Sequence, residues 1–297
     1  MEIFMNSLTK KYGKITALNN INLNIKGQGC VGLLGPNGAG KTTMLKLITN
    51  IIKPTHGGVQ INGINVSENP EKGLNFVGSL IEQPEFYTYL TGNEILDFTR
   101  KIKGIGKEDF KNKIGDIINT TQISTFIDRK TGSYSRGMKQ RLALAVAMIG
   151  DPEIIILDEP TFGLDPKGMK DIRTLISNLA KTKLILLSTH LIYEAREICD
   201  RTIIINNGII EHDSNMADNK FLLKITLDSP ERSIVSGKIK NYAINGNEII
   251  VEKYNDYENY EIIEDLINQG IKVKYVEQFD NLEDVYISIT KKNKVNI

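Results

Sequence analysis

The sequence lacks the features that mark extracellular and membrane-embedded proteins. It has no tryptophan and only two cysteines, Cys30 and Cys199, among 297 residues. Two cysteines without a CxxC pair in a chain of this length are typical of reduced core thiols, which predicts a cytoplasmic protein. No apolar run approaches the ~20 residues of a membrane-spanning helix, and the first twenty residues are too polar and interrupted for a signal peptide. If the protein moves a substance across a membrane, another chain must supply the path.

The sequence also lacks an excess of one charge. Its 37 basic and 36 acidic side chains nearly cancel, so the charge balance gives no indication of nucleic-acid binding. The three histidines, His56, His190 and His212, are too scattered along the chain to predict a metal cluster. Internal repeats and coiled-coil heptads are absent as well. The apolar content of 40% and charged content of 25% fit a globular protein with one large or two modest domains.

The order of the predicted elements indicates an α/β domain over residues 1–215. Residues 1–30 are expected to form antiparallel strands, and residues 84–150 to be mostly helical. Continuous apolar runs bounded by polar groups predict buried parallel strands around residues 30–34, 154–158 and 184–189. The expected fold therefore has a mixed central sheet, an antiparallel flap and a helical subdomain.

The residues after 215 show a different pattern of predicted elements. Residues 216–219 are expected to form a linker, followed by a small α+β accessory domain over residues 220–297. Its segments predict a strand, a strand–turn–strand, a helix–strand and, at residues 281–290, a last strand or helix. No motif in this tail indicates a site.

A glycine-rich stretch, GPNGAGKT at residues 35–42, fits the pattern GxxxxGK[ST] between an apolar strand and a helix. Glycines let consecutive N–H groups converge on phosphate oxygens at a helix N-terminus. Lys41 is expected to reach the β- and γ-phosphates, Thr42 to hold Mg²⁺, and Thr43 to contact the α-phosphate. The residues expected at the nucleotide are Gly35, Asn37, Gly38, Ala39, Gly40, Lys41, Thr42 and Thr43.

Two adjacent acids end the apolar run IIILDEP. Asp158 suits a water-mediated contact with Mg²⁺, and Glu159 suits a general base that takes a proton from an attacking water. A single acid at a strand end is common by chance. An adjacent pair of acids downstream of a phosphate loop rarely arises by chance. Such a pair therefore predicts nucleoside triphosphate hydrolysis.

Five motifs in this order resemble the nucleotide-binding subunit of ABC transporters: GPNGAGKTT, YSRGMKQR, IIILDEP, GLDP and LLSTH. The resemblance covers residues 1–215. It implies a P-loop NTPase fold of the ABC type that binds and hydrolyses ATP with Mg²⁺. It also implies integral membrane permease subunits as partners, with this chain on the inner face of the cell membrane.

The resemblance further implies roles for single residues. His190 would touch the γ-phosphate and help position the attacking water, and Tyr12 would stack on adenine. Ser135 and the N–H of Gly137 would cover the γ-phosphate held by a second copy of the chain, so two copies would pack head to tail around two ATP molecules. Arg136 stands where the family usually has glycine, which leaves the set of donors open.

The segment before Leu90-Thr91 is expected to couple ATP hydrolysis to the permease. ABC proteins usually have glutamine about eight residues before this pair, where the present chain has Glu82, with Gln83 one residue later. We favour Glu82 as the residue that senses the metal, with Gln83 as the alternative. Glu82, the phrase EFYTYLTG and the motif SRGMKQR resemble the branch that exports bacitracin and lantibiotic peptides and confers immunity or resistance.

Two other functions fit parts of the pattern. The chain could energise the export of another substrate, or it could be a soluble ABC regulator without a transport role. A single cassette and the lack of heptads argue against the soluble ABC proteins that act on ribosomes or chromosomes, and Glu159 argues against a module that binds ATP without turnover.

Overall fold

The computed structural model divides the chain into two compact units, Met1–Asp213 and Ser214–Ile297. It describes residues 1–215, 221–228, 242–253, 259–280, 282, 286–287 and 289. The linker predicted at 216–219, and most of the last element predicted at 281–290, lie outside the described residues. The two units are described separately below.

The first sheet of the larger unit is antiparallel, with strand order β2-β1-β4-β5. Its strands are β1 (Glu2–Tyr12), β2 (Ile15–Lys26), β4 (His56–Ile61) and β5 (Ile64–Asn65). Asn62 and Gly63 connect β4 to β5 and both have positive φ, at 47° and 78°, as a two-residue hairpin turn requires. Register shifts between β1 and β2 break the strict alternation of buried and exposed residues in β2.

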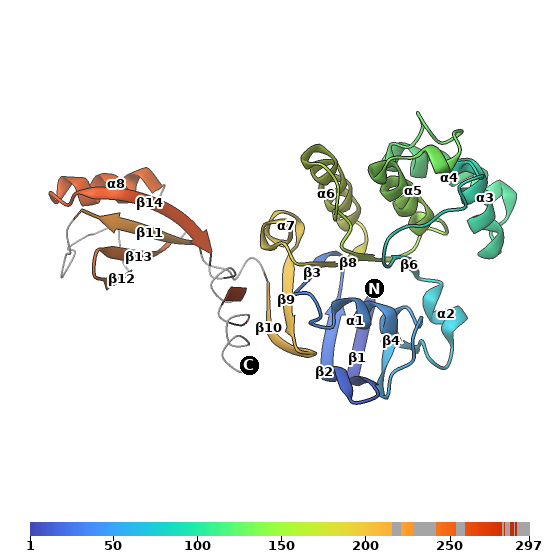
Figure 1. Ribbon diagram of the computed structural model, residues 1–297, viewed down its shortest axis with the longest axis horizontal. Coiled ribbons are helices and arrows are strands. Elements are labelled where there is room, and N and C mark those ends of the chain that lie inside the picture. Colours follow the sequence, from blue (N-terminus) through green and yellow to red (C-terminus); the bar gives the residue numbers. More distant parts are fainter. Residues whose placement is uncertain are drawn as a thin grey trace. The chain divides into compact units, whose positions relative to one another are not determined.

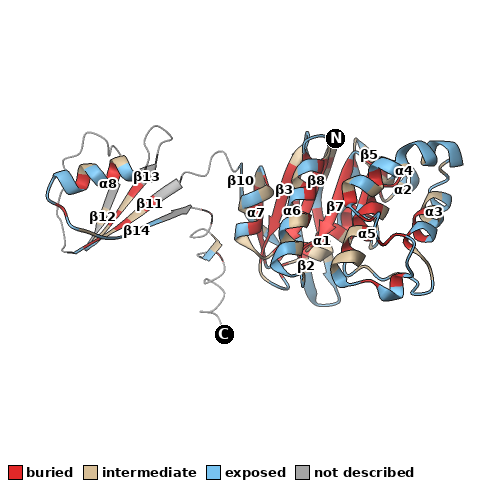
Figure 2. Ribbon diagram, turned by 90° about the horizontal axis from the view of Figure 1, so that it is seen from above, coloured by how far each residue is buried: buried red, intermediate tan, exposed pale blue. Residues whose placement is uncertain are grey.

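The second sheet contains six strands in the order β10-β9-β3-β8-β7-β6. They are β3 (Gly29–Leu34), β6 (Val77–Leu80), β7 (Ile154–Asp158), β8 (Leu184–Thr189), β9 (Arg201–Asn206) and β10 (Ile209–Asn215). The pairs β6–β7, β7–β8, β8–β3 and β3–β9 are parallel. The central strands β3, β7 and β8 are buried along nearly their whole length (Figure 2), because a parallel sheet is covered on both faces.

Seven helices of the larger unit connect its strands, and those between residues 84 and 150 form the predicted helical region. The seven helices are α1 (Lys41–Ile48), α2 (Pro70–Leu74), α3 (Gly92–Ile102), α4 (Lys107–Thr121), α5 (Arg136–Met148), α6 (Pro166–Ala180) and α7 (Ile192–Ile198). Thr91 and Glu94 form a reciprocal capping box at the start of α3, and Asp165 caps α6 by accepting from the N–H of Gly168. Helices α3, α4 and α5 gather beside the parallel sheet (Figure 1) and share a hydrophobic core of their own.

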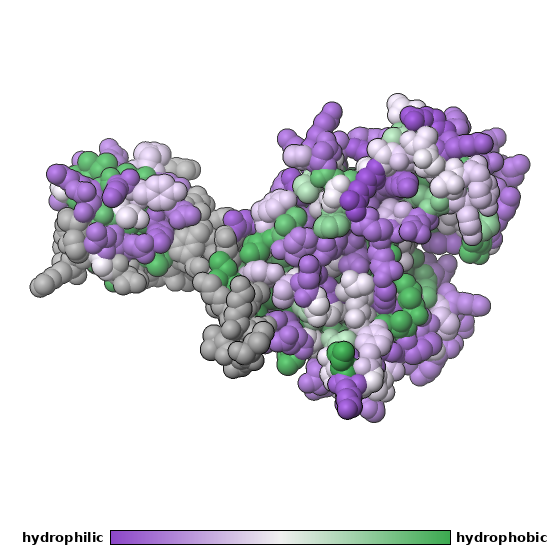
Figure 3. All heavy atoms as spheres, viewed as in Figure 1, coloured by the Kyte–Doolittle hydropathy of each residue, from purple (hydrophilic) through white to green (hydrophobic). Residues whose placement is uncertain are grey.

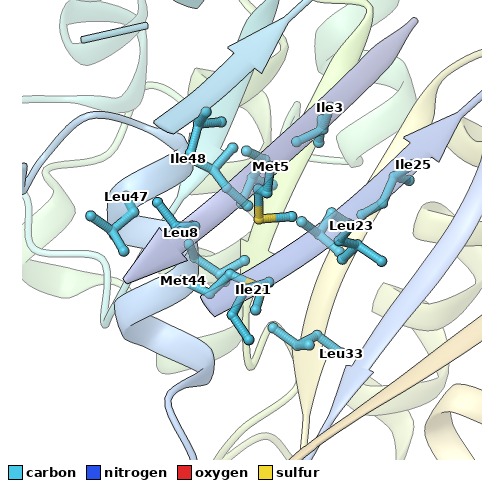
Figure 4. Close-up of a cluster of buried hydrophobic side chains, with 14 of the residues drawn as sticks. Ile3, Met5, Leu8, Ile21, Leu23, Ile25, Leu33, Met44, Leu47 and Ile48 are labelled. Carbon is cyan, nitrogen blue, oxygen red and sulfur yellow. The ribbon is translucent and has the colours of Figure 1, made fainter. Parts of the chain in front are cut away.

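The main core joins both sheets through α1. Met44, Leu47 and Ile48 of this helix are buried with Met5 and Leu8 of β1 (Figure 4). Full burial of each such side chain stabilises the fold by about 1.5–3 kcal/mol. This packing fixes the helix that follows the glycine-rich loop.

The smaller unit contains an antiparallel sheet with the order β12-β13-β11-β14. Its elements are β11 (Phe221–Leu227), β12 (Tyr242–Asn245), β13 (Glu248–Lys253), α8 (Asn259–Asn268) and β14 (Val273–Asp280). Ile262 and Leu266 of α8 are buried against Leu223, Ile225 and Ile249 of the sheet. The described residues of the tail thus form a separate α+β unit with its own core.

None of the helices in the described ranges combines the length and the apolar character needed to cross a lipid bilayer. On the face of the larger unit visible in Figure 3, hydrophilic residues predominate and apolar residues form small separate patches.

Candidate nucleotide-binding and catalytic site

Three adjacent parallel strands bring the predicted site residues together. In the sheet, Leu34 of β3 lies beside Thr189 of β8, and Ser188 of β8 lies beside Asp158 of β7. The loop after each strand therefore leaves from the same edge of the sheet. The carboxyl ends of parallel strands are the usual place for a ligand site in an α/β fold.

The loop between β3 and α1 needs glycine for steric reasons. A Cβ atom at Gly35 would lie 2.3 Å from the carbonyl oxygen of Ile205 in β9. Gly38 and Gly40 have φ of 83° and 111°, which side chains rarely tolerate. Asn37 and Gly38 are exposed at the tip of the loop, and the carbonyl of Ala39 accepts from the N–H of Gly208. The loop leads directly into the N-terminus of α1, where backbone N–H groups can bind an anion.

Lys41, the first residue of α1, is only 5% exposed. Its Nζ donates to the carbonyl oxygens of Gly35 at 2.7 Å and Pro36 at 3.2 Å, and it lies 3.8 Å from Oε1 of Glu159. Burial lowers the pKa of Lys41, while the carboxylates of Glu159 and Asp158 oppose the shift. A buried cation inside the glycine loop can supply charge to a bound phosphate.

Hard oxygen donors meet beside the start of α1. The hydroxyl of Thr42 donates to Oδ2 of Asp158 at 2.9 Å, and the hydroxyl of Ser188 donates to Oδ1 of the same carboxylate. Asp158 is 9% exposed. Carboxylate and hydroxyl oxygens are the donors that Mg²⁺ prefers, so Thr42 and Asp158 could hold a divalent cation next to the phosphate loop. Ser188, part of the motif LLSTH, is the additional partner that the structure supplies.

Glu159 and His190 form a pair at the mouth of the site. Nδ1 of His190 lies 3.1 Å from Oε2 of Glu159. The backbone of Glu159 has a φ of 44°, and its N–H donates to the backbone oxygen and the hydroxyl of Ser188, both at 3.1 Å. Their side chains are 27% and 35% exposed, so water can reach a carboxylate flanked by an imidazole. This arrangement can accept a proton from a water molecule.

Behind this pair lies a buried carboxylate that the sequence does not single out. Glu194 of α7 is 1% exposed and accepts hydrogen bonds from the hydroxyls of Thr161 and Thr189. The sequence gives one indication of its partners. Polar residues, including Thr161 and Thr189, come at or just after the ends of β7 and β8, and the carboxyl ends of these strands form the edge of the sheet where the site lies.

Tyr12 ends β1 and is 47% exposed. Nζ of Lys10 lies 5.0 Å from the centroid of its ring. An exposed ring in this position is suited to stacking on a base, and the role of Tyr12 stays a prediction.

The segment YSRGMKQR spans the start of α5. Ser135 is the N-cap, and its Oγ accepts from the N–H of Met138 at 3.3 Å. A Cβ atom at Gly137 would have only Leu164 Cδ2 nearby, at 3.8 Å. The N-terminus of α5 can therefore bind an anion, although within the described parts of the chain it does not take part in the phosphate loop.

Arg136 turns back onto its own chain. Its Nη2 donates to Oε1 of Gln83 at 2.9 Å, and its guanidinium lies 5.3 Å from the ring centroid of Phe162. The Phe162 ring in turn approaches that of His190 edge-on, with centroids 6.3 Å apart. The long side chain thus contacts residues near the catalytic pair of the same chain.

The two candidate coupling residues have different partners. Glu82, with a φ of 66°, forms an ion pair with Lys46 of α1 at 2.5 Å. Gln83 accepts from Arg136 at the start of α5. Glu82 therefore contacts α1, the helix that follows the phosphate loop, and Gln83 contacts α5.

The two cysteines lie outside the nucleotide site. Cys30 and Cys199 are buried and free, with their sulfur atoms 3.4 Å apart, which confirms the prediction of core thiols. The contact with Cys30, together with burial, raises the pKa of the Cys199 thiol. Among the residues that the structure describes, no group of three histidine, cysteine, aspartate or glutamate side chains is placed to bind a metal ion.

Comparison with known proteins identifies the family. The model of the ABC transporter family matches residues 18–162. The bacitracin transport ATP-binding protein BcrA of Bacillus licheniformis is 35% identical, over 95% of each chain. The chain belongs to the ABC transporter ATP-binding proteins. The lantibiotic transport ATP-binding protein SrtF of Streptococcus pyogenes is 33% identical, over 72% of this chain and 91% of its own.

A solved structure shows the same fold. The ATP-binding cassette MJ0796, solved as a dimer in a post-hydrolysis state with ADP and Pi, is 30% identical, with a TM-score of 0.65 over 72% of this chain and 98% of its own. The predicted ABC-type P-loop fold is confirmed. As a member of this family, the ABC ATPase binds and hydrolyses ATP, and dimerisation and partnership with membrane subunits are general features of such proteins.

Proposed function

We propose that the chain is the ATPase subunit of an exporter for peptide antibiotics of the bacitracin and lantibiotic type, and that it confers resistance or immunity. The observation that carries this proposal is the similarity to BcrA over 95% of both chains, because the smaller C-terminal unit is then included in the match. Residues 1–215 carry the ATP site, with residues 84–150 as its helical subdomain, and residues 220–297 form an accessory domain. The subunit works at the inner face of the cell membrane, attached to permease subunits.

In this proposal the glycine loop and Lys41 bind the phosphates of ATP, Thr43 adds an α-phosphate contact, and Tyr12 stacks on the adenine. The position of Lys41 inside the loop supports its role, because a phosphate could replace the two carbonyl oxygens that it now contacts. Glu159 takes a proton from the attacking water, and His190 orients that water and the γ-phosphate.

Mg²⁺ fits the oxygen donors found beside the phosphate loop. Thr42 would bind it directly and Asp158 through water, with Glu82 or Gln83 completing the set. When bound, the ion would neutralise charge on the phosphate oxygens. The hydrogen bond between Thr42 and Asp158 supports this assignment, since it places both oxygen donors at one point.

We further propose that two copies pack head to tail. Ser135 and Gly137 of one copy would then cover the γ-phosphate bound by the other. The support is that the N-terminus of α5 is suited to an anion and yet takes no part in the phosphate loop of its own chain. Each chain would therefore carry two half-sites.

The permease would contact the surface that follows the coupling loop. Four large apolar side chains are exposed there, between 48% and 70%: Tyr87, Tyr89, Phe98 and Ile102. The rings of Tyr87 and Tyr89 lie against each other, with centroids 5.7 Å apart. Exposed apolar groups of this kind are typical of an interface, and the segment begins a few residues after Gln83.

An antibiotic susceptibility assay tests the exporter proposal. Cells that produce this chain with the membrane proteins encoded beside it should tolerate higher concentrations of bacitracin or a lantibiotic than cells with the membrane proteins alone. The Glu159→Gln chain, produced at the same level, should give no protection, because export requires turnover. Protection that persists in the Glu159→Gln cells, or no protection against any tested peptide, would contradict the proposal.

Separate substitutions decide which residue couples hydrolysis to export. We expect Glu82→Ala to reduce the stimulation of ATPase activity by the permease and substrate by about tenfold, because it removes the contact with Lys46 on the nucleotide-binding helix. The basal rate of the isolated chain should change much less. If only Gln83→Ala abolishes the stimulation, Gln83 is the coupling residue and the assignment of Glu82 is wrong.

A further inference from the structure

Glu194 is an acidic residue that the proposed mechanism does not use, and its side chain is almost completely buried. It belongs to α7 and is 1% exposed. A buried carboxylate is costly unless hydrogen bonds replace its water. Both of its oxygens are engaged: Oε1 accepts from the hydroxyl of Thr161 at 2.7 Å, and Oε2 accepts from the hydroxyl of Thr189 at 2.5 Å.

The two threonines belong to the two loops that carry the catalytic pair. Thr161 follows Glu159 by two residues, and Thr189 directly precedes His190. The Thr189 hydroxyl also accepts from the N–H of Leu191 at 3.0 Å, so the backbone on both sides of His190 is held. At the front of the same two loops, Oε2 of Glu159 meets Nδ1 of His190 at 3.1 Å.

These contacts close a ring of interactions. It runs from Glu159 along the chain to Thr161, across Glu194 to Thr189, along the chain to His190, and back to Glu159. The rear of the ring is dry and the front is open to water, as the exposures of Glu194 at 1% and of His190 at 35% show. The hydrogen bonds of Glu194 to the two threonines limit how far the side chains of Glu159 and His190 can separate.

We propose that Glu194 is a positioning residue for ATP hydrolysis, which sets the distance between Glu159 and His190. The inference rests on the proposed roles of those two residues. A carboxylate suits this task because it only accepts hydrogen bonds, so it can take one hydroxyl on each oxygen. Glutamine would offer a single acceptor oxygen, and alanine would leave both threonine hydroxyls without their partner.

Steady-state kinetics of the full chain test the inference. Glu194→Ala should lower kcat by about 10- to 100-fold, since a small misplacement of reacting groups costs this much. Its KM for ATP should change by less than about threefold, because the phosphate loop and Tyr12 are untouched. Glu194→Gln should recover part of the lost rate. Glu197→Ala is the matched control on the same helix, because that side chain is 49% exposed and pairs with Arg173, and it should leave kcat unchanged.

A second pair of variants distinguishes loss of the Glu194 contact from a folding defect. Thr161→Val removes the hydroxyl that contacts Glu194 at nearly constant volume, and Thr161→Ser keeps the hydroxyl. All rates are divided by the number of chains that bind ATP, so that unfolded chains do not count. We expect Thr161→Val to be slow and Thr161→Ser to be close to the original chain. Equal rates for the two variants would overturn the inference.

A double substitution separates positioning from a general structural role. If Glu194 acts through His190, adding Glu194→Ala to the His190→Ala chain should lower its remaining rate by less than about threefold. A further loss as large as in the unmodified chain would overturn the inference. If His190→Ala alone keeps full turnover, the proposed site roles fail and the inference fails with them. If His190→Ala is slow while Glu194→Ala is fast, only the positioning role fails.

Discussion

Glu159→Gln is expected to lower ATP turnover by at least about 100-fold, the usual contribution of a general base, while ATP binding is retained. Glutamine has almost the same shape and can keep contacts to His190, but it cannot take a proton from water. Because the carboxylate lies 3.8 Å from Nζ of Lys41, loss of its charge should not weaken phosphate binding. The checks are the steady-state rate of phosphate release and the affinity for a labelled ATP analogue.

The same variant should accumulate a dimer when ATP is added. We expect hydrolysis to open the head-to-tail pair, so a chain that binds ATP without cleaving it should stay closed. Sedimentation with and without ATP measures this directly. A Glu159→Gln chain that still releases phosphate at more than about a tenth of the original rate would contradict the role of general base.

Lys41→Ala is expected to have the second largest effect. Removal of the only side-chain cation found in the glycine loop, among the described residues, should lower turnover by about 100- to 1000-fold and weaken ATP binding as well. Lys41 is 5% exposed, and its Nζ contacts the carbonyl oxygens of the loop itself. Lys53→Ala is the control, because Lys53 lies on the surface beyond α1 and contacts Asn50. A Lys41→Ala chain with unchanged ATP affinity and turnover would contradict the assignment of the phosphate loop.

The sequence predicted best those parts of the site that depend on local structure. The glycines at 35, 38 and 40 mark a loop geometry that few other residues allow. The apolar runs before Asp158 and before Ser188 identify strand ends, and parallel strands bring their ends to one edge. The start of α6 is also readable from the sequence, because Asp165 followed by proline is a typical N-cap.

The contacts that could not be predicted from the sequence are those between residues far apart in the chain. Glu194 meets Thr161 across 33 positions, and Cys30 meets Cys199 across 169. Arg136 contacts Gln83, 53 positions away, and Phe162 of its own chain. No periodicity encodes such pairs, since they depend on how strands and helices pack in three dimensions.

If each ATP site is built from two chains, Gly137→Asp should damage only the half that α5 supplies. The substitution has room, with Leu164 Cδ2 as the nearest atom at 3.8 Å from the added Cβ. An aspartate in the first turn also favours the helix itself. Its charge should nevertheless repel the γ-phosphate bound by the facing chain, whereas Gly137→Ala should cost little. Loss of activity in Gly137→Asp but not in Gly137→Ala would therefore point to the facing phosphate.

The most direct test is the ATPase rate of an equimolar mixture of Lys41→Ala and Gly137→Asp chains. Each should be nearly inactive alone, since each spoils both sites of its own dimer. In a mixed dimer, the glycine loop of the Gly137→Asp chain faces the intact α5 of the Lys41→Ala chain, so one site is complete. The mixture should regain up to about a quarter of the original rate, because about half of the dimers are mixed and each of these has one complete site. A Gly137→Asp chain that is fully active alone, or a mixture no faster than the sum of its parts, would contradict a site built from two chains.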